Sequence, residues 1–104
     1  MAAFGTSLNA VNAAGAGSAI VFDEPKAVFS LQTISTGGPS YTIYLELSCD
    51  GVNWFRTSLS QSSDTIGQLP SVAGAQFPAI AARANLTSIS GGSSPTVTAS
   101  IAAH

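Results

Sequence analysis

The chain has 104 residues and a net charge of −2, and only 8% of its residues are charged, against about 25% in an ordinary soluble domain. This length suits one domain with a modest core. Three basic residues, Lys26, Arg56 and Arg83, are too few for the cationic surface that nucleic acid requires, which argues against nucleic-acid binding.

The cysteine count and the lengths of the apolar segments indicate the cell compartment in which the protein is made. A single Cys cannot form an internal disulfide, so the chain is not a disulfide-stapled secreted module. The N-terminus lacks the basic region and the uninterrupted apolar core of a signal peptide, and no segment reaches the roughly 18 apolar residues of a membrane span. We therefore expect a protein made in a cytoplasm, with no membrane partner.

Neutral polar residues replace the missing charges, because Ser and Thr together number 25 and Ala numbers 17. Such a surface lacks the charge repulsion that normally keeps a small domain monomeric. We expect much of it to lie against other subunits. A secreted or cell-wall domain of low charge is the alternative.

Residues 1–18 are rich in Ala, Gly and Asn and have little periodicity, so they cannot bury enough apolar surface to offset their own ordering entropy. We predict an extended N-terminal arm over 1–18, followed by a β-sandwich domain over 19–104. The arm can dock on its own sheet or on a neighbouring subunit, and both remain open. If it is separable, a chain without residues 2–17 still folds. Its candidate interface residues are Phe4, Leu8 and Val11.

The first three expected strands follow the arm. An apolar run at 19–22 ends in the turn-like "DEPK", and residues 27–34 alternate in polarity. Residues 41–48, "YTIYLELS", show the clearest alternation in the chain. The expected core residues of these strands are Phe29, Leu31, Tyr41, Ile43, Leu45 and Leu47.

A hairpin turn is predicted at 49–51, "CDG", because Asp50 and Gly51 tolerate the backbone angles of a tight turn. The return strand is expected over 52–60, with Trp54 as a core anchor. In an alternative interpretation, Trp54 and the outward-facing Tyr44 form a sugar-stacking platform or an interface hot spot.

Residues 61–79 hold two Pro and two Gly without a sustained period, and predict one long loop with room for a short strand or a helical turn. A loop of this length is typical of functional or interface-forming segments, and its candidate interface residues are Ile66, Leu69 and Phe77. The segments "IAARANLTSI" and "PTVTASIA" predict a final strand pair. Their expected core residues are Leu86, Val97 and Ile101.

These elements predict an all-β fold, an antiparallel β-sandwich or jelly-roll-like barrel of about 6–8 short strands with no long helix. The reactive residues are few. His104, the only His, ends the chain and is poorly placed to act as a general base, and Cys49 has no neighbouring His to activate it.

Two ligating residue types, Cys and His, occur once each, which is too few for zinc. Asp50 and Asn53 could contribute to a calcium site, but Asp-Gly is first of all a turn signal. Glu46 and Asp50 are not expected to face each other as the carboxylate pair of a glycosidase. We predict no catalytic residue, no metal site and no cofactor.

The segments "LSCDGVNWFR" and "AARANLTSISGGSSPTVTASIAA" together resemble small virion proteins of tailed bacteriophages over residues 41–103. The resemblance implies a capsid decoration or cement protein, which binds the outside of the capsid lattice, often as a trimer, or a head-fibre or tail accessory module. The hairpin also resembles those of discoidin-like carbohydrate-binding sandwiches. In those longer proteins the Trp is commonly structural, which implies a fold-building role for Asp50, Gly51 and Trp54 and supplies no sugar site.

We therefore expect a non-enzymatic structural virion protein and favour a capsid decoration protein that stabilises the lattice through subunit contacts. Its expected partners are the major capsid protein or other virion proteins, and copies of itself, with a trimer favoured. The alternative is a glycan-binding or fibre-accessory module. An enzyme ranks third and would require a cleft that unites His104 with an acid and a Ser.

Overall fold

Two antiparallel sheets form the fold in the computed structural model, which describes residues 4–69 and 78–104. The described residues contain no helix, and so none that is long and apolar enough to cross a membrane. Within this part of the chain there are nine strands: β1 (Phe4–Val11), β2 (Gly15–Ala16), β3 (Ile20–Lys26), β4 (Phe29–Thr36), β5 (Ser40–Ser48), β6 (Phe55–Gln61), β7 (Thr65–Leu69), β8 (Ala79–Ser90) and β9 (Thr96–Ala103).

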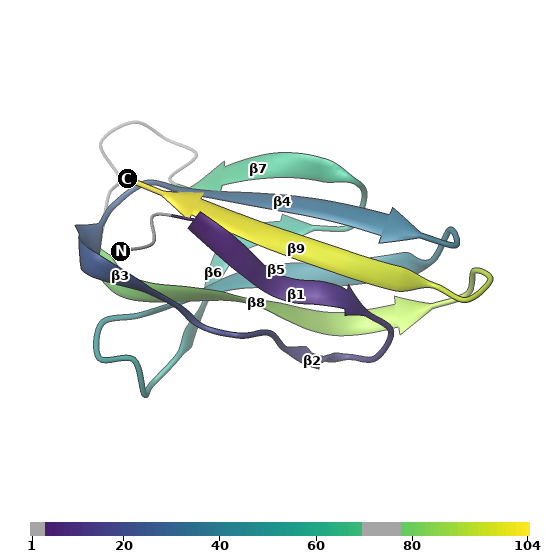
Figure 1. Ribbon diagram of the computed structural model, residues 1–104, viewed down its shortest axis with the longest axis horizontal. Helices are drawn as coiled ribbons and strands as arrows, with labels where there is room; N and C mark the ends of the chain where they lie inside the picture. Colours follow the sequence, from purple (N-terminus) through teal and green to yellow (C-terminus); the bar gives the residue numbers. More distant parts are fainter. Residues whose placement is uncertain (1–3, 70–77) are drawn as a thin grey trace.

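The sheets lie one above the other, as Figure 1 shows. One sheet has four strands in the order β1-β9-β4-β7. The other has five strands. Four of them follow the order β2-β8-β5-β6, and the fifth, β3, pairs with β8. Every strand pair is antiparallel, so the predicted all-β sandwich is confirmed, although the strand count exceeds the expected 6–8.

The core lies between the sheets and follows the period-two alternation of the longest strands. In β4, β5 and β9, inward-facing residues alternate with outward-facing ones because successive side chains of a strand point to opposite faces. All nine core residues expected from the pattern are buried: Phe29, Leu31, Tyr41, Ile43, Leu45, Leu47, Leu86, Val97 and Ile101.

The N-terminal segment is part of the sandwich, so of its two possible docking modes the structure shows the internal one. Strand β1 is the edge of the four-stranded sheet beside β9, and β2 pairs with β8. Leu8 is buried in the core at 3% exposure. Over residues 4–16, the prediction of a separate extended arm is therefore wrong, because backbone pairing compensates for the weak apolar pattern.

Polar contacts also fasten this segment to both sheets. The buried Ser7 hydroxyl donates to the Ser18 carbonyl oxygen at 2.7 Å and accepts from the Ala84 N–H at 2.9 Å. At Gly17 the backbone passes so close to β1 that a Cβ atom would clash with the Ser7 carbonyl oxygen. Glycine is therefore required there for the chain to close the side of the sandwich.

Other boundaries also differ from expectation. The predicted turn at 23–26 belongs to β3, which extends to Lys26; Pro25 fits there because the β3–β8 register is interrupted between Val21 and Lys26 and no ladder donor is needed. The predicted loop at 61–79 contains β7, the other edge of the four-stranded sheet. Thr65–Leu69 has too little alternation to reveal a strand by itself.

Candidate functional site

The predicted hairpin turn exists, and Asp50 holds it together. Its carboxylate accepts hydrogen bonds from the backbone N–H groups of Val52 and Asn53, each at 2.8 Å, from the Asn53 Nδ2 at 2.8 Å and from the Ser48 hydroxyl at 2.9 Å. Gly51 has a φ of 77°, in the left-handed region that favours glycine. Asp50 and Gly51 thus both stabilise the turn between β5 and β6.

These hydrogen bonds lower the pKa of Asp50 well below its ordinary value, chiefly through the Asn53 and Val52 N–H groups. The carboxylate therefore stays charged and fully engaged within the turn. A group in this state is a poor general base, because proton transfer requires a pKa nearer the working pH.

We predict that Asp50→Asn is less stable than the wild type at pH 7 and that the difference shrinks in acid. A lowered folded-state pKa gives stability that is present above the unfolded pKa of about 3.9 and is lost as the pH falls toward the folded pKa. Urea unfolding between pH 7 and pH 2 measures the difference. Glu24→Gln, which removes an exposed carboxylate on β3, is the matched control. A constant difference at all pH values would contradict the prediction.

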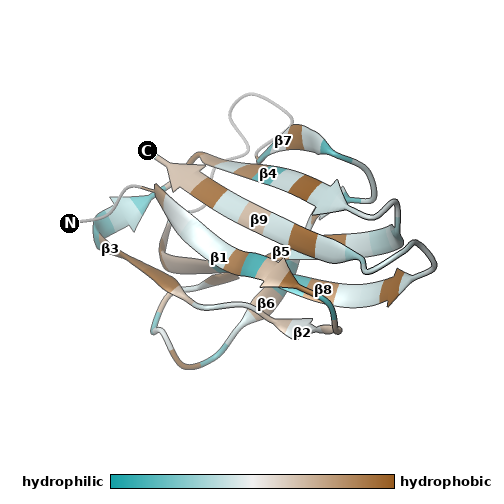
Figure 2. Cartoon of the chain, turned by 45° about the vertical axis from the view of Figure 1, so that its right-hand side comes forward, coloured by the Kyte–Doolittle hydropathy of each residue, from teal (hydrophilic) through white to brown (hydrophobic). Residues whose placement is uncertain are grey.

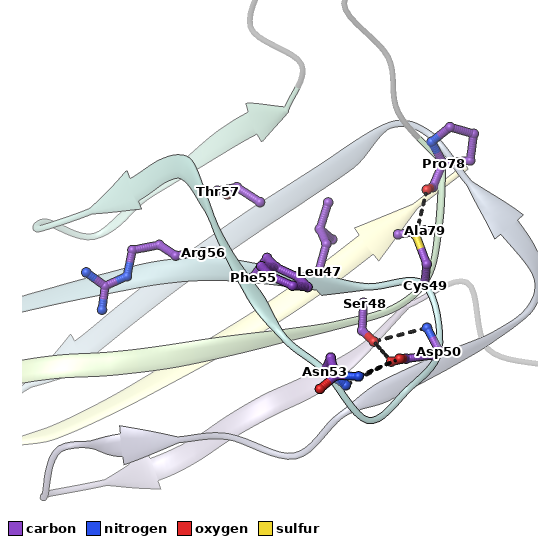
Figure 3. A pocket seen from close by; sticks show the side chains of 10 residues that line it. All are labelled: Leu47, Ser48, Cys49, Asp50, Asn53, Phe55, Arg56, Thr57, Pro78 and Ala79. Carbon is purple, nitrogen blue, oxygen red and sulfur yellow. Dashed lines mark hydrogen bonds between the residues drawn. The ribbon is translucent and has the colours of Figure 1, made fainter.

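A pocket of about 300 Å³ lies beside this turn, at the start of β6 (Figure 3). It is lined by Leu47, Ser48, Cys49, Asp50, Asn53, Phe55, Arg56, Thr57, Pro78 and Ala79. Its polar groups Ser48, Asp50 and Asn53 bond to one another in the turn, and the exposed Cys49 sulfur lies 3.5 Å from the Pro78 carbonyl oxygen. Among the described residues that line the pocket, the one carboxylate is Asp50, and its hydrogen bonds within the turn leave it unsuited to activate the thiol.

The outer face of the five-stranded sheet carries a network of charged and aromatic side chains. We call it the charged face and define it by Tyr44, Glu46, Trp54, Arg56, Arg83 and Asn85. The Arg83 Nε lies 2.7 Å from Glu46 Oε1, and Asn85 Nδ2 lies 3.0 Å from Glu46 Oε2. Strand register places the residues together, because Glu46 lies opposite Arg83 on β8 and opposite Arg56 on β6.

Each aromatic ring of the charged face is stacked with a guanidinium. The Arg83 Cζ is 4.5 Å from the Trp54 ring centroid, and the Arg56 Cζ is 4.1 Å from the Tyr44 ring centroid. Burial alone would raise the pKa of Glu46, but hydrogen bonds from Asn85 and Arg83 and the arginine charges lower it. Glu46 therefore remains an anion on this face.

The prediction of Trp54 as a core anchor is wrong. Trp54 precedes β6 and is half-buried against Arg83, outside the space between the sheets. Its neighbour Phe55 is not a core residue either, at 71% exposure. The reason is the length of the connection: residues 49–54 join the strands, so strand alternation does not begin until Phe55.

The outer face of the four-stranded sheet has the opposite character. Strands β1, β4, β7 and β9 contain no Asp, Glu, Lys or Arg. Figure 2 shows these strands mostly in the pale colours of weakly polar residues, with separate brown segments. Three large apolar side chains are exposed here, namely Phe4 at 74%, Ile66 at 63% and Ile34 at 49%. We call this surface the uncharged face.

A shallow groove of about 400 Å³ crosses the uncharged face. Phe4 and Ile66, from the two edge strands, both line it. The other lining residues come from β1, β4 and β9: Gly5, Thr6, Ser30, Gln32, Ser100, Ile101 and Ala102. Sheet formation thus brings together two predicted interface residues that are 62 positions apart in the sequence.

The remaining predicted interface residues have different positions. Leu8 and Leu69 are core residues, so the chain itself covers both, whereas Val11 is only partly buried against the core. Phe77 lies outside the described residues. Among residues 4–69 and 78–104, no group of three or more His, Cys, Asp or Glu side chains could hold a metal ion.

Two residues of the charged face, Arg83 and Asn85, were missed as site residues by sequence reasoning. Their contacts with Glu46 depend on the register of β5 against β8, strands that are 30 residues apart in sequence. The available signal in the sequence was that Arg83 and Asn85 lie two positions apart, which places both on one face of β8.

Comparison with known proteins gives no assignment. No protein-family profile matches the chain, and no curated protein sequence matches it. A solved structure described as the crystal structure of PirA is similar to it with 14% sequence identity and a TM-score of 0.42, over 98% of this chain and 85% of that chain. A likeness at this level supports no conclusion about function.

Proposed function

We propose that the chain is a non-enzymatic structural subunit that binds other protein subunits through its uncharged face. The observation that carries the proposal is the absence of any charged residue from the four strands of that sheet, together with the exposure of Phe4, Ile34 and Ile66. Covering a charged group with protein is costly, whereas Ser, Thr and Gln side chains are cheaper to desolvate and can hydrogen-bond across an interface.

The size of the face supports the proposal. The molecule measures 40 × 26 × 21 Å, and the sheets lie across its two longer dimensions (Figure 1). A specific protein interface covers about 800 Å² on each partner, so docking here would engage most of this side of the molecule. The groove between Phe4 and Ile66 supplies the concave feature into which an apolar anchor of a partner fits.

The sequence resemblance over residues 41–103 favours a virion as the setting, with the major capsid protein or another virion protein as the partner. In such a role, the uncharged face of each copy binds the outer capsid lattice or a neighbouring copy, with a trimer as the favoured oligomer. Stabilisation then adds up over many copies, so that each contact can be modest.

Ile66→Lys is expected to weaken subunit binding by about 30-fold or more, because a buried interface anchor contributes about 2 kcal/mol or more. Val52→Lys is the matched control, since Val52 is 77% exposed but lies in the β5–β6 turn. Analytical ultracentrifugation measures self-association, and co-sedimentation with empty capsids measures attachment. The proposal would be contradicted if a folded Ile66→Lys variant kept both self-association and capsid attachment. It would also be contradicted if Ile66→Lys and Val52→Lys lost them equally.

A further inference from the structure

The charged face has the opposite electrostatic sign to the chain as a whole. It contains both arginines of the sequence and one carboxylate, Glu46, and therefore carries one excess positive charge on a chain of net charge −2. It lies on the outer side of β5, β6 and β8 in the five-stranded sheet, directed away from the uncharged face. A ligand bound here would not compete with a subunit docked on the other sheet.

The two arginines differ in their availability. Arg83 is engaged with Glu46 and Trp54, and its side chain is 26% exposed. Arg56 is exposed and stacks on Tyr44, and among residues 4–69 and 78–104 no carboxylate lies within salt-bridge distance of its guanidinium. Stacking restrains the side chain while the N–H donors at its edge stay available.

An orientated guanidinium with available donors matches a carboxylate, which accepts two parallel hydrogen bonds from it. The half-buried rings of Tyr44 and Trp54 add apolar area with a polar edge, which suits a ligand that has both apolar and polar surface. A sugar ring that bears a carboxylate combines these features. A nucleic acid does not fit, because one available cation cannot neutralise a run of phosphates.

We propose that the charged face binds acidic sugar residues of a polysaccharide, with the Arg56 guanidinium bonded to the sugar carboxylate and the rings of Tyr44 and Trp54 against the sugar. A single exposed ion pair is weak in water. Each copy therefore binds weakly, with a Kd on the order of millimolar, and firm attachment requires many copies on a polymer with many acidic residues.

The test titrates the isolated protein with trigalacturonate and, separately, with its neutral counterpart galactotriose. Trp54 is the only Trp, so its fluorescence reports directly on this face, and NMR chemical shifts of the backbone amides locate the contact. Arg56→Gln is expected to weaken trigalacturonate binding about tenfold. Lys26→Gln is the matched control, because it lowers the net charge by the same amount at a residue paired with Asp23 on β3.

The proposal holds if the wild type binds trigalacturonate more tightly than galactotriose, and if Arg56→Gln loses binding while Lys26→Gln keeps it within about twofold. Equal loss in the two variants would indicate unspecific charge attraction and overturn it. Equal binding of both sugars, or no binding of trigalacturonate at concentrations of tens of millimolar, would overturn it as well. Thermal unfolding confirms that each variant is folded. The outcome does not depend on subunit docking, because the isolated chain is measured.

Discussion

A chain that lacks residues 2–17 is expected to be largely unfolded at 25 °C, contrary to the separable arm that the sequence suggested. The deletion removes β1, the edge partner of β9, and β2, a partner of β8. Loss of the buried Leu8 side chain costs about 2–5 kcal/mol. Loss of Ser7 leaves the buried Ala84 N–H without its acceptor, at a further cost of about 1–3 kcal/mol.

These two losses alone are comparable with the whole stability of a small domain, about 5–15 kcal/mol. Far-UV circular dichroism and an NMR amide spectrum of the truncated chain measure the outcome. Two single substitutions test the contribution of this strand. Ser7→Ala is expected to lower the free energy of unfolding by about 1–3 kcal/mol. Asn9→Ala, at an exposed site of the same strand, is expected to lower it by less than about 0.5 kcal/mol. A truncated chain with dispersed amide signals and an unchanged melting temperature would restore the separable arm.

Phe29→Ala is expected to lower the free energy of unfolding by about 3–5 kcal/mol, whereas Trp54→Ala is expected to cost only about 1–2 kcal/mol. Phe29 is 1% exposed and packs against Phe22 with ring centroids 6.1 Å apart. Its removal leaves a cavity that the surrounding strands cannot collapse to fill. Trp54 loses its stacking on Arg83, but water replaces the ring without forming an internal cavity.

Urea unfolding followed by far-UV circular dichroism measures both variants without relying on Trp fluorescence. Val52→Ala, at a highly exposed position of the β5–β6 turn, provides the baseline for a surface truncation. A Trp54→Ala cost equal to that of Phe29→Ala would place the indole in a core-like environment and contradict the position seen here.

The core could be predicted because apolar residues recur at every second position over much of β4, β5 and β9. Burial of such a pattern requires one side of a strand to face the core, so Phe29, Leu45 and Ile101 are identified without knowledge of their partners. The same logic failed for β1 and β7. Leu8 and Leu69 are the fully buried large apolar residues of these strands, and a single large residue does not define an alternation.

The candidate site was predictable only in its local part. The roles of Asp50 and Gly51 depend on hydrogen bonds between residues within three positions of each other, so the sequence alone was enough to predict the turn. The position of Trp54 was not, because the length of a hairpin connection determines where strand parity begins. Neither Trp54 nor its neighbour Phe55 belongs to the core.

The sequence by itself determined the all-β class, the core of the central strands, the Asp50 turn and the shortage of charge. Each depends on residue composition or on neighbours along the chain. Only the tertiary structure decided that Phe4 and Ile66 share a groove, that residues 4–16 close the sandwich, and that Arg83, Glu46 and Arg56 form one row. The physical reason is strand register: backbone hydrogen bonds, which are the same for every residue type, join positions far apart in sequence and so select which side chains meet.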